Sequence, residues 1–418
     1  MGNFISLKLG NFKSLLTEGL KVFSVSLELP EFKVVKQVFH EEFFQLNVVK
    51  KSTEERCPYC GFLTNHVHDR RTRKVRDLKV LHKPLFLFVQ VNRFRCFNCD
   101  EVFTQTFESI QPNKHQTNRY REYLYEQCLG STIKMVSEKE NIPYTTLERL
   151  FYSIATEKEI EHINELEENL RDEELVISID EVAVRKGHRY ETVLMDAKTG
   201  RVLAMEENRS FESTQLLLTK NLLSQSCVET VVVDMWKPFH KAVQTLFPAA
   251  CLVIDKYHVV QKVTQALDQV RKLFPTLKKG RFALLKGYEN LTEQQKQQLE
   301  GWLDEHDELA LAYYLKESFR DFYQASDYDT AEELLDNWIN EAKASPFRAY
   351  QEVARTLEKW KASILQYFLT PYTNGRIEGT NHKIKNIKRR AYGFRNIQRF
   401  RLRVFLECTG KTNEKQAA

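Results

Sequence analysis

Apolar runs of β-strand length mark the centre of the chain. The run Leu175–Ile179 is rich in β-branched residues and predicts a buried strand that ends at Asp180. The runs Thr192–Met195 and Val202–Met205 follow, and the Lys198-Thr199-Gly200 sequence between them is typical of a tight hairpin turn. We therefore expect three adjacent antiparallel strands, with Asp180 at the end of the first.

A second carboxylate follows a second buried strand. The amphipathic segment Phe211–Leu223 predicts a helix, and Thr230–Val233 predicts a strand that ends at Asp234. Because strand–helix–strand connections are right-handed and parallel, Asp234 should reach the same sheet edge as Asp180. Ligands bind at that edge in open α/β sheets. A single strand-end Asp is usually only solvated, but two at one edge predict a shared site.

One more strand and a helix extend this region. Ala250–Ile254 predicts a strand that ends at Asp255, and His258 follows on a helix that continues to Leu273. Asp255 and His258 are therefore expected near the same crevice as Asp234. We assign both to a supporting role and prefer Asp234 as the metal ligand.

Helical periodicity dominates the segment before these strands. Three helices are predicted there: Tyr120–Leu129, Thr132–Glu140 and Thr145–Ile154. Thr145 and Glu148 form a capping-box pattern after Pro143. Short helices around a tight turn are typical of a helix-turn-helix, whose second helix would present Tyr144, Thr146 and Arg149 to the DNA major groove. A purely structural helical hairpin gives the same pattern.

Two further helical segments carry no evident chemistry. Thr156–Glu174 is acidic with one apolar stripe, and we interpret it as a connector. Residues 273–369 are almost wholly helical, with expected helix starts at Thr292, Thr330 and Ser345. Trp302, Trp338 and Trp360 recur on its apolar faces, which indicates a core rather than a base-stacking surface.

Eight cysteines divide into two matched pairs and four single residues inside apolar segments. The pairs are the knuckles Cys57-Pro-Tyr-Cys60 and Cys96-Phe-Asn-Cys99. Four thiolates at this spacing predict a structural Zn²⁺ site, and paired disulfides are the poorer explanation in a reducing cytoplasm. His66 and His68 are alternative ligands if one cysteine does not participate. Basic residues crowd the knuckles, from Arg70 to Lys79 and at Arg93 and Arg95, which favours contact with phosphates.

Composition changes this picture little. The chain has 418 residues, 42% of them hydrophobic and 28% charged, as in an ordinary soluble protein of two to four domains. No stretch approaches the roughly 20 apolar residues that span a bilayer, so we expect a cytoplasmic protein with no membrane partner. The net charge is only +5, but the charges are unevenly distributed. Between Arg376 and Arg403, ten Lys and Arg residues accompany one acid, Glu378.

The surroundings of Glu378 point to phosphate chemistry. The block Asn374-Gly-Arg-Ile-Glu-Gly-Thr-Asn-His opens a helix that carries five candidate DNA-binding cations. These cations are Lys383, Lys385, Lys388, Arg389 and Arg390. Lys385 and Arg389 lie four residues apart and share a helix face. An acid amid such cations is expected where a metal ion and a phosphate meet.

These features together resemble a known family. Asp180, the Val-Asp-Met-Trp sequence at Asp234, the Asp255-Lys-Tyr-His sequence and the block around Glu378 resemble the DDE transposases of bacterial insertion sequences, and most closely the ISL-three family. The resemblance covers nearly the whole chain, from Cys57 to about Phe405. It implies a multidomain α/β protein: a zinc-binding module, a helix-turn-helix domain, and an RNase H-like mixed-sheet catalytic domain with a helical insertion before its final Glu.

The expected domain boundaries follow from these elements. The zinc-binding module takes residues 1–112, the helix-turn-helix domain 113–156 and the acidic linker 157–174. The catalytic domain occupies 175–272 and resumes at 373–418 with the final helix and a basic C-terminal segment. The helical insertion takes 273–372 between these two parts.

The resemblance implies a catalytic triad of Asp180, Asp234 and Glu378. Carboxylates suit Mg²⁺ (or Mn²⁺), and two such ions per active site would clamp the attacking and leaving oxygens of phosphodiester cleavage and strand transfer. Asp180 would bridge both ions, and Asp234 and Glu378 would each hold one. The partners would be double-stranded DNA, namely the terminal inverted repeats and target DNA, and a second copy in a homodimer or larger assembly. When bound to DNA, the protein would be associated with the bacterial nucleoid.

Two alternative functions fit the same motifs. A DNA-binding regulator would keep the cysteines and the helix-turn-helix but make no use of the three acids. An RNase H-like nuclease would cut DNA without joining it. Cleavage and joining assays distinguish all three functions.

Overall fold

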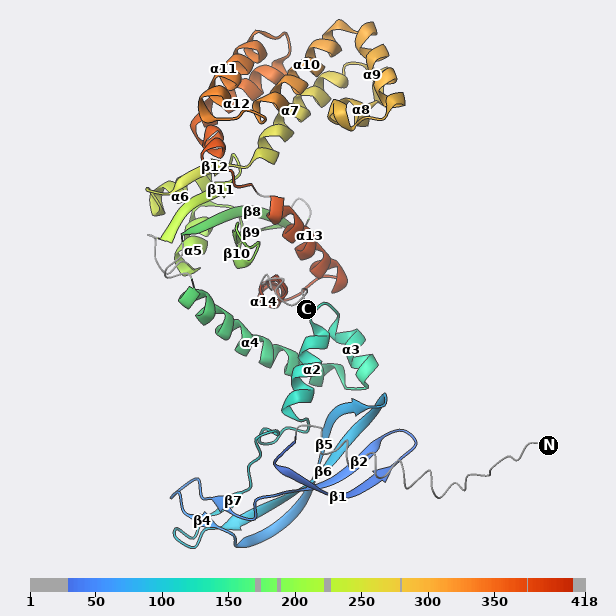
Figure 1. Ribbon diagram of the computed structural model, residues 1–418, viewed down its shortest axis with the longest axis vertical. Coiled ribbons are helices and arrows are strands. Elements are labelled where there is room, and N and C mark those ends of the chain that lie inside the picture. The colour runs from blue at the N-terminus through green and yellow to red at the C-terminus, as the bar shows by residue number, and fades with distance from the viewer. Residues whose placement is uncertain are drawn as a thin grey trace, which may run out of the picture. The chain divides into compact units, whose positions relative to one another are not determined.

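The structure is a computed structural model, and it describes residues 29–169, 174–185, 189–221, 227–278, 280–373 and 375–408 (Figure 1). The chain divides into two compact units, Met1–Ala155 and Thr156–Ala418. The boundary between them lies inside one helix, α4 (Tyr144–Asn169). Each unit is described by itself.

The first unit is built on a five-stranded sheet. Its strands are β1 (Phe32–Phe39), β2 (Phe44–Lys50), β5 (Val67–Val80), β6 (Lys83–Arg95) and β7 (Val102–Thr104). The order is β1-β2-β6-β5, with β7 paired to β6, and only β2 and β6 run parallel. A separate small ribbon, β3 (Glu55–Arg56) with β4 (Leu63–Thr64), frames the first cysteine knuckle.

Alternation along β6 builds the core of this sheet. Leu85, Leu87, Val89 and Val91 are buried, and the residues between them are partly exposed, as expected for a strand with one face covered. The alternating run Leu85–Val91 forms the centre of this strand. The strand is longer at both ends because hairpin pairing with β5 continues to Lys83 and Phe94.

Three helices complete the first unit: α2 (Asn118–Cys128), α3 (Ile133–Glu140) and the start of α4. The Thr117 and Thr132 hydroxyls accept the N–H of the third residue of α2 and α3, which defines both starts. Asn141 ends α3 in the left-handed conformation, with φ of 50°. Ile133 and Val136 are buried, as their spacing predicted.

The sequence predicted two helices in this region, the first with a start at Thr145. The structure has one helix, α4, in their place. It begins one residue earlier, at Tyr144, where the Pro143 carbonyl accepts the N–H groups of Thr146 and Leu147. It then continues without a break to Asn169. No Gly or Pro separates Ile154 from Thr156, so nothing in the sequence interrupts the helix.

The second unit contains the mixed sheet that the sequence predicted. Its strands are β8 (Leu175–Arg185), β9 (Arg189–Asp196), β10 (Val202–Glu207), β11 (Val228–Val233) and β12 (Cys251–Ile254). The order is β10-β9-β8-β11-β12. Strand β9 is antiparallel to both β8 and β10, and β11 is parallel to both β8 and β12.

Helices cover both faces of this sheet (Figure 1). Helices α5 (Phe211–Asn221), α6 (Lys237–Leu246) and α7 (Lys256–Arg271) pack with Leu194 and Val231 of the sheet. Helices α13 (Gly375–Arg390) and α14 (Ile397–Glu407) pack with Val193 and Met195. Neighbouring residues of β9 thus point to opposite cores, which is the period of two expected of a strand buried on both faces.

Helices form nearly all of the segment between α7 and α13. Four of them are α9 (Glu293–Glu305), α10 (Asp307–Phe322), α11 (Tyr328–Ala344) and α12 (Arg348–Leu365). Shorter helical turns lie at η2 (Pro275–Lys278), α8 (Arg281–Leu285), η3 (Tyr288–Asn290) and η4 (Gln366–Phe368).

The capping box predicted at Thr292 is present, because Thr292 and Gln295 exchange both bonds. Asp327 rather than Thr330 caps α11, and α12 begins at Arg348, beyond the predicted start at Ser345. Trp338 and Trp360 are buried, as expected for core residues. Among the described residues, no helix has both the length and the apolarity needed to cross a membrane.

Candidate active site and zinc site

Asp180 and Asp234 meet at one edge of the mixed sheet. Asp180 lies within β8, and Asp234 directly follows the neighbouring parallel strand β11. His258, on the first turn of α7, completes a group whose potential ligand atoms all lie within 4.8 Å of one another. His258 Nδ1 lies 3.1 Å from Asp234 Oδ2. The structure thus brings together two of the three predicted triad acids and one predicted supporting residue.

The Asp180 carboxylate has a fixed orientation. Its Oδ1 accepts the backbone N–H of Glu181 at 2.6 Å, and its Oδ2 accepts a hydrogen bond from the Asn381 side-chain amide. Asn381 is buried on α13, and its Oδ1 has no hydrogen-bond partner in the described part of the chain. One oxygen of Asn381 therefore remains available to a ligand beside Asp180.

Asp234 lies in an electrostatically unfavourable place. Burial raises its pKa from the ordinary value of 3.8 to about 8, and the nearby carboxylates of Asp180, Asp255 and Glu181 add to the shift. Its Oδ1 is buried and has no hydrogen-bond partner among the described residues. A bound divalent cation would satisfy that oxygen and offset the repulsion. The residues at this edge therefore fit a metal ion with oxygen ligands.

Glu378 is not part of this group. It lies in the first turn of α13 with an exposed side chain, outside the group formed by Asp180, Asp234 and His258. It is three residues before Asn381, so the two positions share a helix face, and Asn381 contacts Asp180. Glu378 thus lies within one helical turn of Asn381, which contacts Asp180.

Asp255 takes a backing position. It is only 2% exposed and stands at the N-cap of α7, where its N–H donates to the Val233 carbonyl. Its charge contributes to the raised pKa of Asp234. This location fits the supporting role predicted from the sequence, which stays a prediction.

The five cations of α13 divide into two groups. Lys383 donates to the Glu407 carbonyl, Lys388 to the Val184 carbonyl, and Arg390 to both Glu407 carboxylate oxygens. These three side chains fasten α13 to neighbouring elements. Lys385 and Arg389 are exposed. The helix thus presents two of the five predicted DNA-binding residues freely to solvent.

The helix-turn-helix candidates lie at the start of α4. Tyr144 and Arg149 are exposed and Thr146 is half-buried. At the end of the preceding helix, the carboxylate of Glu140, buried at 1% exposure, accepts hydrogen bonds from Lys79 and from Tyr120 and Tyr123. This network joins α3 to β5 and α2, so it holds the helices at a fixed position within the unit.

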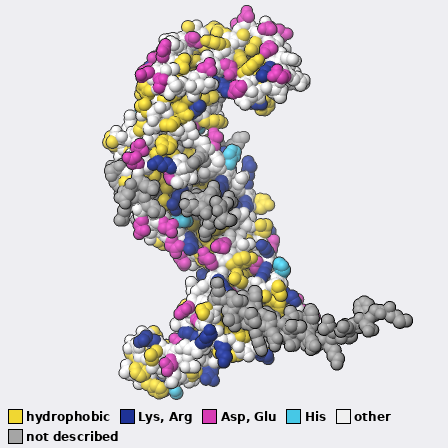
Figure 2. Space-filling view, in the orientation of Figure 1, with side chains coloured by type: hydrophobic (Ala, Val, Ile, Leu, Met, Phe, Trp, Pro, Cys, Tyr) yellow, Lys and Arg dark blue, Asp and Glu magenta, His cyan; other side chains and the backbone are white. Residues whose placement is uncertain are grey.

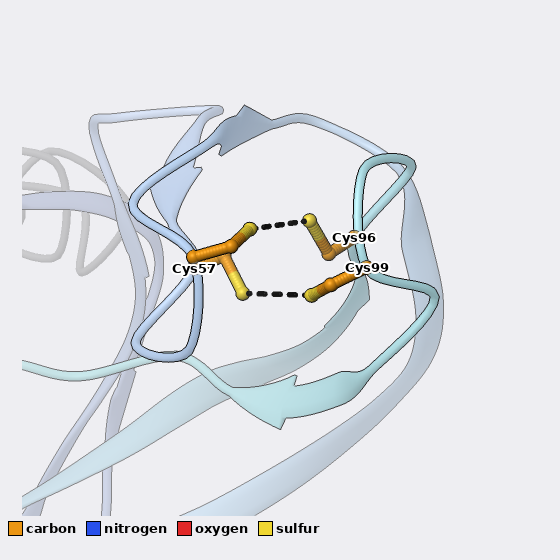
Figure 3. Close-up of side chains that lie close together, drawn as sticks. Cys57, Cys96 and Cys99 are labelled. Atoms are coloured by element: carbon orange, nitrogen blue, oxygen red, sulfur yellow. Dashed lines mark hydrogen bonds between the residues drawn. The ribbon is translucent and has the colours of Figure 1, made fainter.

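The four predicted zinc ligands converge in the first unit (Figure 3). Cys57 Sγ lies 3.6 Å from Cys99 Sγ, and Cys60 Sγ lies 3.5 Å from Cys96 Sγ. These separations are far longer than a disulfide bond of about 2.05 Å. They match the edge of a tetrahedron with Zn–S bonds of about 2.3 Å, which is roughly 3.8 Å. His66 and His68 are outside this group, so the four cysteines suffice.

Both knuckles have the same backbone design. The Cys57 carbonyl accepts the N–H of Gly61, and the Cys96 carbonyl accepts the N–H of Asp100, each at 2.9 Å. Gly61 and Asp100 both have positive φ, 75° and 63°, as required to close each turn. Sequence reasoning found the Cys-x-x-Cys spacing but not this repeated turn.

The thiols do not ionise equally. A hydrogen bond from the Asn98 side chain, with one from the Phe62 N–H, lowers the pKa of Cys60 to about 6. For Cys99, the Glu101 N–H lowers the pKa, but desolvation and the neighbouring thiols outweigh it and raise the pKa to about 12. One thiolate therefore forms near neutral pH and opposes ionisation of its neighbours. Bound Zn²⁺ removes this repulsion because it favours all four thiolates.

The basic residues near the knuckles lie mostly on β5. Figure 2 shows Lys and Arg side chains gathered over the strands of this unit. Some have internal partners: Arg76 pairs with Glu140, and Lys74 lies over the Phe86 ring. Arg70 and Arg71 are exposed. The exposed cations Arg70 and Arg71 thus lie in the N-terminal half of β5.

Sequence reasoning missed two residues beside Asp180. Glu181 is adjacent in the chain, and burial raises its pKa although Arg209 pairs with it. Asn381 could have been recognised by its spacing, since it follows Glu378 by three residues in a helix. Arg209 also lies over the ring of Trp236, the residue that precedes α6.

Comparison with known proteins identifies the class. A transposase profile matches residues 177–404, and the zinc-finger profile of the transposases IS204, IS1001, IS1096 and IS1165 matches residues 53–99. The first match spans 228 of the 418 residues, the mixed sheet and the helical segment included. The chain is a transposase.

The transposase profile is that of the ISL3 family, so the chain belongs to the ISL3 (ISL-three) family of insertion-sequence transposases. The resemblance seen in the sequence is confirmed.

Individual relatives agree with this assignment. The chain is 27% identical over 367 residues to the transposase for insertion sequence element IS1001 of Bordetella parapertussis, covering 83% of this chain and 87% of that protein. It is 28% identical over 256 residues to the transposase for IS1557 of Mycobacterium tuberculosis, covering 53% and 57%. A Lactococcus lactis protein named ATP-dependent protease matches over only 98 residues, 30% of its length.

Proposed function

We propose that this transposase binds the terminal inverted repeats of its insertion sequence, cuts the DNA at the repeat ends and joins the freed ends to target DNA. The meeting of Asp180 and Asp234, where β11 ends beside the middle of β8, carries the proposal. Family membership supplies the reaction class, and the sheet edge supplies two acids suited to it.

The catalytic domain in this proposal is RNase H-like. Three antiparallel strands followed by two parallel ones, in the order β10-β9-β8-β11-β12, support that assignment. So does the position of Glu378 on a helix packed against the same sheet, after a helical insertion.

Asp180, Asp234 and Glu378 would hold Mg²⁺ or Mn²⁺. Such ions polarise the phosphate and stabilise the attacking and leaving oxygens. The rest of the centre is built by the chain. Asn381 fixes the Asp180 carboxylate, His258 contacts the Asp234 carboxylate, and the pairing of β8 with β11 sets the separation of the two acids.

The reaction would proceed in two displacements at phosphorus. Water attacks the phosphodiester at the repeat end, the P–O bond to the 3′ oxygen breaks, and that oxygen leaves as a 3′-hydroxyl. The 3′-hydroxyl then attacks a target phosphodiester, forms a new P–O bond and releases a target 3′-hydroxyl. No covalent intermediate with the enzyme is required.

DNA recognition would be divided among the modules. Tyr144, Thr146 and Arg149 at the start of α4 would enter the major groove as the second helix of a helix-turn-helix. The zinc module would contact phosphates through the exposed cations of β5. Two ends must be held for joining, so we propose a homodimer or larger assembly.

The test is incubation of the full-length protein with labelled duplex that ends in the inverted repeat, with Mg²⁺ or with chelator. Metal-dependent cuts at the repeat boundary followed by joined products are expected. Cuts without joined products would favour a nuclease, and tight binding without cuts would favour a regulator with a vestigial catalytic domain.

A further inference from the structure

A basic groove lies on the second unit, apart from α13. Its volume is about 680 Å³, and α6 and α12 form most of its walls. The groove contains three lysines, Lys237, Lys241 and Lys359, and an aromatic floor. His240 packs edge-on against the Trp360 ring at 5.0 Å, and Lys241 lies 4.9 Å from the centre of the Phe211 ring.

The positive charge of this groove is not neutralised by the protein. None of its lining residues is acidic, and in the described part of the chain no ion pair involves Lys237, Lys241 or Lys359. Glu212 is exposed, and hydrogen bonds from its own N–H and from Ser210 lower its pKa, with a smaller contribution from the charge of Lys241. Other lysines of the unit do form ion pairs with acids: Lys296 contacts Glu293, and Lys343 contacts Glu358.

Lys237 and Lys359 form a like-charge pair across the groove. They come from different helices, and the contact with Lys237 together with the repulsion between the two charges lowers the pKa of Lys359. Two ammonium groups approach each other at a cost in free energy unless an anion lies between them. The pair therefore has the arrangement of an anion site.

The position of the groove indicates which anion. Helix α6 begins only three residues after Asp234, so the groove lies at the strand end that carries the candidate reaction centre. Trp236, the N-cap of α6, makes no side-chain cap, so the positive end of this helix adds to the field of Lys237. An open groove lined by three lysines and no acid suits a repeating polyanion better than a small enclosed ligand.

We propose that the α6–α12 groove is a second DNA-backbone contact of the catalytic unit, in which Lys237 and Lys359 bind phosphates of the duplex held at Asp180 and Asp234. This inference rests on the proposed function. The shared chemistry is the phosphodiester backbone, and the duplex belongs either to the element end or to the target.

Lysine acetylation of the full-length protein tests the groove directly. The protein is treated in chelator, alone, with repeat-end duplex or with unrelated duplex, and acetylated lysines are located by mass spectrometry. Protection of Lys237 and Lys359 is expected, while the carboxylate-paired Lys296 and Lys343 should react equally in all samples. Protection by the repeat-end duplex alone assigns the groove to the element end, and protection by both duplexes assigns it to target DNA.

Paired variants supply the quantitative test. Lys237→Ala with Lys359→Ala should reduce the slope of log affinity against log salt by roughly two, because each phosphate contact contributes about 0.9. The control pair Lys296→Ala with Lys343→Ala should leave the slope unchanged, and Lys237→Arg with Lys359→Arg should retain it.

The outcomes separate the two proposals. A wild-type protein that fails to bind or cut repeat-end DNA would overturn the proposed function. A wild-type protein that does both, with Lys237 and Lys359 unprotected and the alanine pair indistinguishable from the control pair, would overturn the groove alone.

Discussion

The position of Asp234 is unfavourable for folding but suitable for binding a cation. Its carboxylate is mostly buried, has one oxygen without a hydrogen-bond partner in the described chain, and lies near three other carboxylates. In the absence of metal this arrangement opposes folding, because the ionised form is disfavoured. The same arrangement suits a cation, so a functional requirement explains why the residue costs stability.

Replacing Asp234 with Asn should therefore stabilise the metal-free protein while abolishing DNA cleavage. The pKa of Asp234 rises from 3.8 to about 8 on folding, so between these values the folded state binds more protons and stability falls as pH rises. Asn removes that loss, which is on the order of a few kcal/mol above pH 8. Thermal unfolding in chelator between pH 5 and 9 measures it.

The pH profile supplies the control for this prediction. The wild-type melting temperature should fall across that range more steeply than that of Asp234→Asn. In an added measurement below about pH 3 the pH dependence from Asp234 should vanish, because the wild-type carboxyl is then protonated in both states. Parallel profiles would show that Asp234 is not destabilising. Added Mg²⁺ should raise the melting temperature of the wild type and not that of the variant.

At this scale the sequence identified the acids but not their neighbours. Asp180 and Asp234 could be placed together because β-branched runs predict two buried, neighbouring strands. The predicted end of the first strand at Asp180 was wrong, because β8 continues to Arg185. Asn381 and Glu181 escaped notice because their roles depend on a contact between α13 and β8 that no local pattern encodes. For the same reason the exposed position of the Glu378 side chain could not be predicted.

Among the structural elements, α13 has some cationic side chains bonded within the protein and others exposed to solvent. Arg390 donates to both oxygens of Glu407, which also accepts a hydrogen bond from Arg403 at 2.9 Å. This buried network ties α13 to α14. Lys385 and Arg389 point instead to solvent. One face of the helix is thus anchored and the other is free to meet phosphate.

Substitutions on the two faces should have different effects. Arg390→Ala should destabilise the protein by about 1–3 kcal/mol, because Glu407 loses a charged partner in a buried setting. Lys385→Ala with Arg389→Ala should leave stability within about 0.5 kcal/mol and weaken DNA binding in a salt-dependent way. Denaturant unfolding and binding titrations distinguish them. Equal effects on stability would contradict this division of α13.

The two cysteine knuckles have only a small hydrophobic core, so a bound metal ion would be needed to stabilise them. Their buried cluster is small, formed by Cys57, Cys96, Phe94 and Phe103, and too few apolar residues surround the two turns to fix them. Zinc binding would supply the missing free energy. The sequence predicted the ligands because their spacing is local, and it missed the matched turns because they are a property of the backbone.

Cys99→Ser should lower the zinc content from about one ion per chain to a small fraction of that value, because three thiolates bind zinc much more weakly than four. Cys57, Cys60 and Cys96 should then react with alkylating agents in the native protein. Zinc analysis and alkylation measure both effects. Cys128→Ser provides the control, since Cys128 lies outside the four-cysteine group. Full zinc content in Cys99→Ser would contradict the four-cysteine site.

In the whole molecule, charge is distributed by unit and element rather than by total. The net charge is +5, yet Figure 2 shows acidic side chains scattered over the visible face of the helical segment and basic ones over the strands of the first unit. Cation-rich surfaces lie on β5, on the face of α13 that carries Lys385 and Arg389, and in the α6–α12 groove. A polyanion such as DNA would meet these surfaces and avoid the acidic ones.

The larger divisions of the chain were only partly predictable. The three antiparallel strands and the parallel strand before Asp234 were expected from strand patterns and connection rules, whereas the full strand order was not predicted. A boundary was expected after residue 156, where the acidic segment begins, but its location inside one continuous helix was not predicted. The sequence placed separate helices there, although only a breaker residue could have produced them.

The most direct test of the central claim compares Asp180→Asn with Asp196→Asn on labelled duplex ending in the inverted repeat, in Mg²⁺. Asp196 is a matched control because it ends β9 of the same sheet, away from the candidate reaction centre. We predict that Asp196→Asn cuts and joins DNA like the wild type. We predict that Asp180→Asn binds the duplex normally but forms neither cut nor joined products. Cleavage by Asp180→Asn at the wild-type rate would contradict the account.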